Sequence, residues 1–259
     1  MELRLYQVDA FTDRPFGGNP AAVCPLDQWL PDDLLQAIAA ENNLSETAYF
    51  VRKGDVFELR WFTPAVEVDL CGHATLATAW TIFNEYPDRL DMLRFATRSG
   101  ELRVSKVPDG LAMDFPVTVP VPCAAPDGLF TALGIHNGHV LEADDYIVAV
   151  EDEAIVRDLR PDFNALRAFP KRGVVVTAPG AQFDFVSRWF GPNVGVDEDP
   201  VTGSAHAWLA PYWARRLGKH RLSAEQGGAR KGQLVCEMSG DRVIITGKAA
   251  LYLKGAISF

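Results

Sequence analysis

An internal repeat constrains the fold of this chain more than any other feature of its sequence. The octapeptide FELRWFTP, Phe57 to Pro64, returns as FVSRWFGP, Phe185 to Pro192, about half of the 259-residue chain later. Such a spacing indicates two copies of one structural unit. The octapeptide is either a strand-end packing motif or a motif with a chemical role, and we favour packing.

The segments around each octapeptide follow one order: strand, octapeptide, loop, glycine turn, apolar helix. The stretch VDLCGHATLATAWTIF predicts a helix over Ala74 to Phe83, and DEDPVTGSAHAWLAPYWARRLG predicts one over Ala205 to Leu217. The first helix has almost no charged side chains, so we expect it to be buried on all sides. Short strands around one buried helix, twice over, predict an α+β fold. Its two pseudo-twofold-related halves would each be a rolled, mostly antiparallel, barrel-like sheet around a central helix.

Other segments complete the two halves. The Pro-rich stretch VPVPCAAPDG, Val119 to Gly128, lacks periodicity and is the best boundary. We therefore predict an N-terminal half over 1–118, joined by a final strand near 250–259, and a C-terminal half over 119–249. Strands are predicted over 3–11, 47–51, 56–62, 145–150 and 173–177, short strands within 93–115 and 234–259, and helices over 31–43 and 153–166, the second broken or kinked at Pro161.

Charge and composition exclude several classes of function. The formal net charge is −9 and the positive charges are scattered, which argues against a nucleic acid or an anionic membrane as a partner. No run of 18 or more apolar residues predicts a membrane span, and MELRLYQVDAF lacks the pattern of a secretory signal. We therefore expect a cytoplasmic protein with four free cysteines. The sequence has no zinc-ligand spacing, and the two histidines of GIHNGHV, His136 and His139, fit a polar turn better than a metal site.

Two glycine turns are the best candidates for chemistry. Each half places a glycine directly before its apolar helix, in Cys71-Gly72-His73 and in Thr202-Gly203-Ser204. A helix N-terminus has unpaired amides and a partial positive charge, and glycine lets a ligand approach the backbone. If the turns face each other across a cleft between the halves, they would hold a carboxylate or an oxyanion. Alternatively, His73 and Ser204 are simple helix caps, although histidine is not a preferred cap.

Glu46 is the candidate acid/base residue. It lies in NNLSETAYFV, where a helix ends and an apolar, aromatic strand begins. Partial desolvation favours the protonated form of a carboxyl group, so such a residue can take and give a proton near neutral pH. The alternative is that Glu46 is a rim residue or caps the backbone.

Four blocks carry a resemblance to a known family. QVDAFTDRPFGGNPAAV, NNLSETAYF, EVDLCGHATLATAW and DEDPVTGSAHAW resemble the signature blocks of the PhzF family of phenazine-biosynthesis-like isomerases, in order and spacing over nearly the whole chain. The resemblance implies the diaminopimelate-epimerase-like fold, an active site between two similar halves, no metal, no organic cofactor and a homodimer. It implies a small carboxylated substrate, without naming it.

The resemblance also implies roles for particular residues. Glu46 falls on the general acid/base, which would move a proton between carbons of one substrate molecule. Other site positions fall on His73, Asp199 and Ser204, which would orient the substrate and adjust Glu46. The Gly-Asn-Pro block puts Gly18 and Asn19 near the same cleft, and the two glycine turns add Gly72 and Gly203 as candidate substrate-binding positions.

Three alternatives remain open. Related racemases use two opposed cysteines, and Cys71 occupies the first such position. The register of the glycine turns pairs it with Thr202, which disfavours a two-thiol mechanism. A mixed pair of Glu46 with Cys71 stays possible, as does Cys71 as an inert buried residue. A cysteine nucleophile is a second alternative, although contact between Cys71 and His73, two residues apart, is expected to be awkward. A non-catalytic protein that binds small carboxylates is the third.

Overall fold

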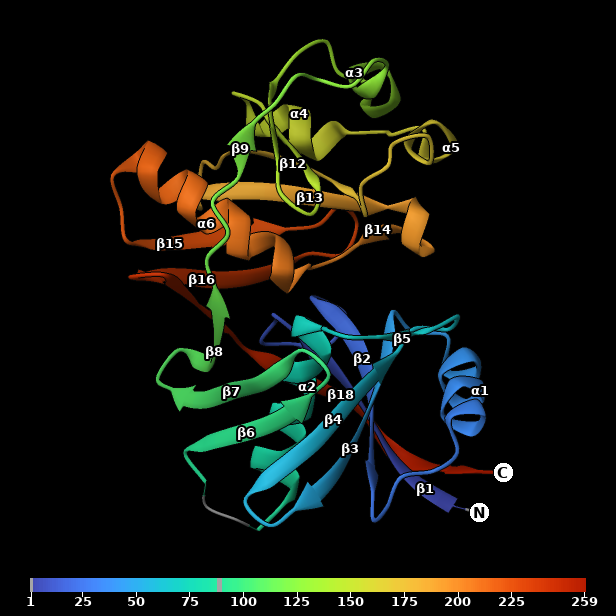
Figure 1. Ribbon diagram of the computed structural model, residues 1–259. Helices are drawn as coiled ribbons and strands as arrows, with labels where there is room; N and C mark the ends of the chain where they lie inside the picture. Colours follow the sequence, from blue (N-terminus) through green and yellow to red (C-terminus); the bar gives the residue numbers. More distant parts are fainter. Residues whose placement is uncertain (1, 88–89) are drawn as a thin grey trace. The chain divides into compact units, whose positions relative to one another are not determined.

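The computed structural model describes residues 2–87 and 90–259 (Figure 1). The chain divides into two compact units: Met1–Asp114 with Ile245–Phe259, and Phe115–Ile244. The first unit is thus made of two separate segments of the chain, whereas the second is continuous. Strand and helix content matches the predicted α+β class.

The first unit wraps its strands around one helix, α2 (Gly72–Glu85), which packs against β1, β2, β3 and β18 (Figure 1). The neighbouring strands lie in the order β18–β1–β2–β3–β4–β6–β7–β8. The pairs β2–β3 and β4–β6 are parallel, and the other pairs in this order are antiparallel. The short β5 pairs with β4. The elements are β1 (Glu2–Ala10), β2 (Asn19–Leu26), α1 (Asp32–Asn42), β3 (Glu46–Lys53), β4 (Val56–Phe62), β5 (Glu67–Val68), β6 (Met92–Thr97), β7 (Gly100–Val107), β8 (Gly110–Pro116) and β18 (Ala249–Ser258).

Burial of α2 explains its composition. Every residue from Gly72 to Ala79 is buried. Three buried threonines turn their hydroxyls back onto the helix, for example Thr75 Oγ1, which donates to the Cys71 carbonyl at 2.6 Å. Thr78 and Thr81 likewise donate to the carbonyls four residues before them, those of Ala74 and Ala77. Polar side chains can therefore lie inside this core without unpaired hydroxyl groups.

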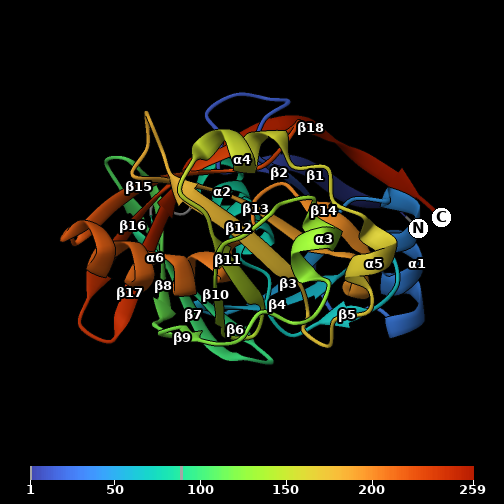
Figure 2. The ribbon, with the colours of Figure 1, turned by 90° about the horizontal axis from the view of Figure 1, so that it is seen from above.

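The second unit repeats the pairing pattern of the first. Strands β10–β11 are antiparallel, β11–β12 parallel, β12–β13 antiparallel, β13–β15 parallel and β15–β16 antiparallel, and β11, β12 and β13 lie side by side in Figure 2. Its main helix, α6 (Gly203–Leu217), packs against β15 and β16. The other elements are β9 (Val121–Pro122), α3 (Leu129–Leu133), β10 (His139–Glu142), β11 (Tyr146–Ala149), α4 (Glu153–Asp158), α5 (Phe163–Leu166), β12 (Val174–Pro179), β13 (Phe185–Gly191), the 3-10 turn η1 (Pro192–Val194), β14 (Val196–Asp199), β15 (Arg221–Gln226), β16 (Gly232–Ser239) and β17 (Arg242–Gly247).

The repeated octapeptide forms β4 in the first unit and β13 in the second. Its arginine plays the same part twice. Arg60 binds both oxygens of Glu67 on β5 through Nε and Nη2, at 2.7 and 2.8 Å. Arg188 binds both oxygens of Glu198 on β14 in the same way, also at 2.7 and 2.8 Å. The octapeptide thus fixes a central strand to its short neighbour in each unit, which is a packing role.

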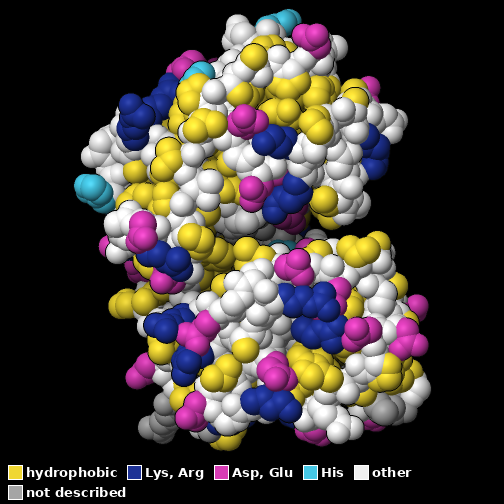
Figure 3. All heavy atoms as spheres, in the orientation of Figure 1, with side chains coloured by type: hydrophobic (Ala, Val, Ile, Leu, Met, Phe, Trp, Pro, Cys, Tyr) yellow, Lys and Arg dark blue, Asp and Glu magenta, His cyan; other side chains and the backbone are white. Residues whose placement is uncertain are grey.

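Side-chain chemistry elsewhere agrees with the composition. Basic and acidic side chains are interspersed on the face drawn in Figure 3. No helix within the described residues is long and apolar enough to cross a membrane. All four cysteines are free thiols.

Candidate active site

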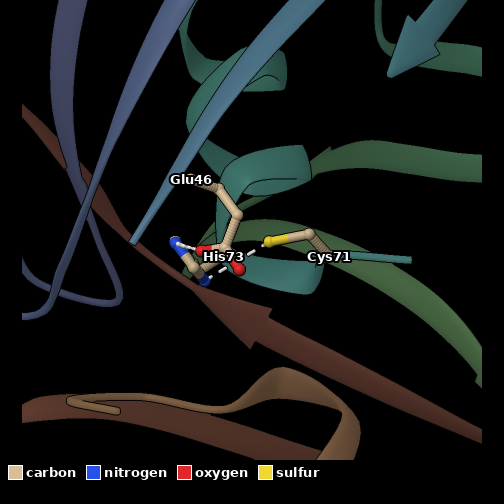
Figure 4. Close-up of side chains that lie close together, drawn as sticks. All are labelled: Glu46, Cys71 and His73. Atoms are coloured by element: carbon tan, nitrogen blue, oxygen red, sulfur yellow. Dashed lines mark hydrogen bonds and ion pairs between the residues drawn. The ribbon is translucent and has the colours of Figure 1, made fainter. Parts of the chain in front are cut away.

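The start of α2 brings three chemically active side chains together (Figure 4). Glu46 is the first residue of β3, and its Oε2 lies 3.1 Å from Nε2 of His73. Nδ1 of the same imidazole lies 3.5 Å from Sγ of Cys71. The side chains of His73 and Glu46 are only 5% and 16% exposed. The expectation that Cys71 and His73 could hardly touch is therefore wrong. Cys71 has an extended backbone at the N-cap, with φ −145° and ψ 111°, and its side chain lies beside the first helical turn.

Burial and charge set the protonation of this cluster. Burial, and then the nearby Glu46 charge, raise the pKa of the Cys71 thiol to about 11, so Cys71 is a neutral thiol at neutral pH. Burial opposes a charge on His73, but Cys71 and Glu46 outweigh it and raise the pKa of the imidazole well above 6.5. Since Cys71 is uncharged, we attribute this rise mainly to Glu46. The raised pKa favours the protonated ring, with Nε2 beside the carboxylate and Nδ1 beside the thiol.

The same three residues are the candidate metal ligands among the residues described, since their ligand atoms lie within 4.8 Å of one another. The imidazole, however, faces the carboxylate with Nε2 and the thiol with Nδ1. A single ion would be bound by only one of these nitrogens. The Cys71 thiol would also have to lose its proton to become a ligand. The arrangement therefore fits an ion pair with a neighbouring thiol better than a metal centre.

Gly18 and Asn19 lead into β2, next to the strand that carries Glu46. Gly18 has φ +59°, and a Cβ there would lie 2.0 Å from the carbonyl oxygen of Ala10, so only glycine fits. Asn19 is fully buried, and its Oδ1 accepts a hydrogen bond from Ser45 Oγ at 3.4 Å. Ser45 directly precedes Glu46. These residues therefore shape the loop that positions the acid/base candidate.

The N-terminus of α6 organises the candidates of the second unit. Asp199 ends β14, and its Oδ2 accepts from Thr202 Oγ1 at 2.5 Å. Gln226 on β15 clamps the same turn, because its Nε2 donates to the Asp199 carbonyl and to Thr202 Oγ1 while its Oε1 accepts from the Thr202 amide. Ser204, in the first turn of α6, accepts from Arg172 Nη2 at 3.1 Å.

Sequence reasoning missed Gln226, Arg172 and Asp145. Gln226 is buried at the end of a strand, and Asp145 is 0% exposed at the start of another. A charged or amide side chain at the end of an apolar strand was the available signal. Their partners are distant in sequence, so the signal alone did not identify the contacts.

The fold is one that epimerases use. A hydroxyproline epimerase of Agrobacterium vitis, solved with bound trans-4-hydroxy-L-proline, superimposes with a TM-score of 0.61, covering 99% of this chain and 92% of that chain. Its 10% identity shows the fold alone. The two proteins thus share one architecture.

Closer relatives give the family. An uncharacterized isomerase of Pseudomonas aeruginosa is 66% identical over 257 residues, covering 99% of each chain. The crystal structure of a PhzF-family protein of Enterococcus faecalis is 46% identical with a TM-score of 0.97, covering 100% of both chains. The family model PhzC-PhzF, described as phenazine biosynthesis-like protein, matches residues 8–255. The chain belongs to this family of isomerases and epimerases, as its signature blocks predicted.

Proposed function

We propose that the protein is a metal- and cofactor-independent isomerase that moves a proton at carbon of a small carboxylated substrate, with Glu46 as general acid/base. One observation carries the proposal. Glu46 Oε2 and His73 Nε2 are buried 3.1 Å apart, yet within the described residues neither atom has a well-aligned hydrogen bond. Buried polar atoms are rarely left so, and such exceptions point to a functional role.

The chemistry follows from a carboxylate held in this position. Glu46 takes a proton from a carbon next to, or conjugated with, the substrate carboxylate. The electron pair of the C–H bond stays on the substrate and spreads into that carboxylate. Protonated Glu46 then returns the proton to another carbon of the same molecule, so that substrate and product are isomers and no electrons leave. General acid/base catalysis of this kind contributes roughly 10²–10⁴-fold.

His73 has a supporting part in this scheme. Its Nε2 lies 3.1 Å from Glu46 Oε2, so the positive charge of a protonated ring stabilises the carboxylate before the proton moves. Asp199 and Ser204, and the glycines Gly72 and Gly203, remain predicted to bind the substrate. Their amides and hydroxyls suit the negative charge that develops on a carboxylate.

Solvent exchange tests the proposal. A panel of small unsaturated and amino-acid-like carboxylic acids is incubated with the protein in D₂O, and deuterium at carbon is measured by mass spectrometry. We expect exchange with at least one acid, and a loss of at least about 100-fold in Glu46→Gln. Glu41→Gln, which changes an exposed glutamate on α1, is the matched control.

The outcomes separate an enzyme from a binding protein. Exchange that survives in Glu46→Gln would rule Glu46 out as the base. If wild type and variant bind the acids equally and neither exchanges them, the protein is a carboxylate-binding protein instead.

A mixed Glu46/Cys71 mechanism is the second candidate, favoured by the contact from Cys71 through His73 to Glu46. With its pKa raised to about 11, the buried thiol would act as an acid and not as a base at neutral pH. Cys71→Ala separates the schemes. Exchange within a few-fold of wild type leaves Glu46 as sole acid/base, whereas exchange that is retained at one carbon and lost at another supports the mixed pair.

A further inference from the structure

Arg172, just before β12, is held more firmly than an ordinary surface arginine. Its Nε and Nη2 donate to the two oxygens of Asp145, at 3.0 and 2.8 Å. Asp145 is fully buried and also accepts from Trp189 Nε1 at 2.6 Å. The guanidinium lies 5.2 Å from the ring centre of Trp189 and 5.3 Å from that of Trp208. A bidentate carboxylate and two aromatic rings fix its orientation.

The internal repeat shows which residue of the second unit occupies the position equivalent to Glu46. In the first unit Thr47 pairs with Phe62, and in the second Val174 pairs with Phe190, the equivalent phenylalanine of the octapeptide. Gly173 therefore occupies the position of Glu46. A Cβ at Gly173 would lie 2.6 Å from Trp189 Cζ2, so no acid fits there.

The second unit has its charged group one residue earlier in the strand register than the first unit has. The charge there is positive and not negative. Glu46 contacts His73, the second residue of α2. Arg172 contacts Ser204, the second residue of α6. One half thus places a carboxylate at its helix start, and the other a guanidinium.

The hydrogen bond from Arg172 decides what Ser204 can do. A guanidinium has only donors, so Ser204 Oγ must be the acceptor. The hydroxyl proton of Ser204 is then directed elsewhere, and it has no acceptor among residues 2–87 and 90–259. A ligand that binds here must offer an acceptor, as a carboxylate does.

We propose that Arg172 is a positioning residue that makes Ser204 a hydrogen-bond donor to an anionic carboxylate group of the ligand. The carboxylate class rests on the proposed function. The contacts that carry the inference, from Asp145 through Arg172 to Ser204, lie within one unit.

Acetate is the probe that tests the inference without turnover. Its binding is followed by NMR, through the amide signals of residues 203–205, in wild type, Arg172→Met, Ser204→Ala and the double variant. We expect saturable shifts in wild type and an affinity about tenfold weaker in each single variant. The double variant should be no weaker than the singles, because both changes remove one interaction.

Controls address folding and specificity. Arg172→Met leaves the buried Asp145 charge unpaired, so Asp145→Asn with Arg172→Met is a second variant that removes both charges and keeps an acceptor for Trp189. Arg157→Met is the matched control, because Arg157 pairs with Glu153 and Glu225 instead. It should bind acetate as wild type does.

Several results would overturn the inference: no shifts in wild type, full affinity in both folded Arg172 variants, or losses that add in the double variant. With an acid found by the exchange screen, we expect Arg172→Met to raise KM more than it lowers kcat. If no acid exchanges at all, the proposed function fails, while the acetate titration still decides the role of Arg172.

Discussion

Two buried histidines near the starts of the main helices differ in protonation because their neighbours differ. His73 faces the Glu46 carboxylate, and its pKa is raised despite burial. His206 has only the Thr202 carbonyl at Nδ1, at 2.9 Å, and burial lowers its pKa to about 4. Its Nε2 is buried without a hydrogen bond among the described residues. Identical side chains thus respond to pH in opposite directions.

His206 predicts a loss of stability in acid. Its folded pKa of about 4 lies below the unfolded value of about 6.5, so the unfolded state binds the proton first. The contribution of neutral His206 to the free energy of unfolding is complete above pH ~6.5 and falls by up to ~3 kcal/mol towards pH ~4. Urea unfolding at a series of pH values measures this. His206→Asn should flatten the slope in that window, and His220→Gln, at an exposed position, should not.

His73 predicts the opposite dependence. A raised folded pKa means that the stabilisation is complete below the unfolded pKa of about 6.5 and is lost as pH rises through the folded value. An NMR titration of the ring Cε1–H should show His73 still protonated at pH 7. In Glu46→Gln the ring should deprotonate at lower pH. An unchanged titration would mean that Glu46 does not hold the proton.

At the scale of elements, the helices were easier to predict than one of the strands. Acidic residues at the start of α1 and Asn43 at its end, with φ +49°, marked that helix closely, and Pro161 separates α4 from α5 as expected. Strand β2 was missed. Its sequence NPAAVCPL contains two prolines, which lack the amide that a ladder needs, so local propensity argues against a strand that tertiary pairing with β1 and β3 imposes.

The candidate site could be predicted only in part. Glu46, Cys71 and His73 are close in sequence to recognisable blocks, so motif reasoning found them. The arrangement of Asp145 and Arg172 joins residues from separate loops and strands, and no local pattern encodes which distant carboxylate an arginine will meet.

The two equivalent tryptophans give a prediction for β4 and β13. Trp61 Nε1 is buried without a partner in the described part of the chain, whereas Trp189 Nε1 donates to Asp145. Trp61→Phe should therefore cost about 1 kcal/mol or less, because no hydrogen bond is lost. Trp189→Phe should cost about 2–3 kcal/mol more, because it leaves a buried carboxylate short of a donor. Denaturant unfolding of the two variants measures the difference, and equal costs would contradict this role for Trp189.

At the scale of the whole molecule, one architecture has been used twice with different chemistry. Strand pairing, the arginine–glutamate pair and the glycine that begins each main helix recur. The polar residues at the helix starts do not. The two units are thus alike in how they pack and different in the polar residues at their helix starts.

The last strand predicts a strong effect of truncation. β18 pairs with β1 along nearly its whole length, from Ser258 opposite Glu2 to Ala249 opposite Ala10. Deleting residues 249–259 would leave β1 as an open edge. We expect the truncated protein to lose cooperative unfolding of the first unit and to aggregate, as circular dichroism and light scattering would show. A truncated chain that unfolds like the full-length protein would contradict this.

The same pairing sets an order of events on the ribosome. The second unit is one continuous stretch of the chain, whereas the first needs residues that lie on both sides of it in sequence. The half whose synthesis begins first therefore cannot complete its sheet until the whole of the other half has been synthesised. A nascent chain of this protein holds Glu46, its candidate acid/base residue, in an incomplete scaffold until β18 has been made.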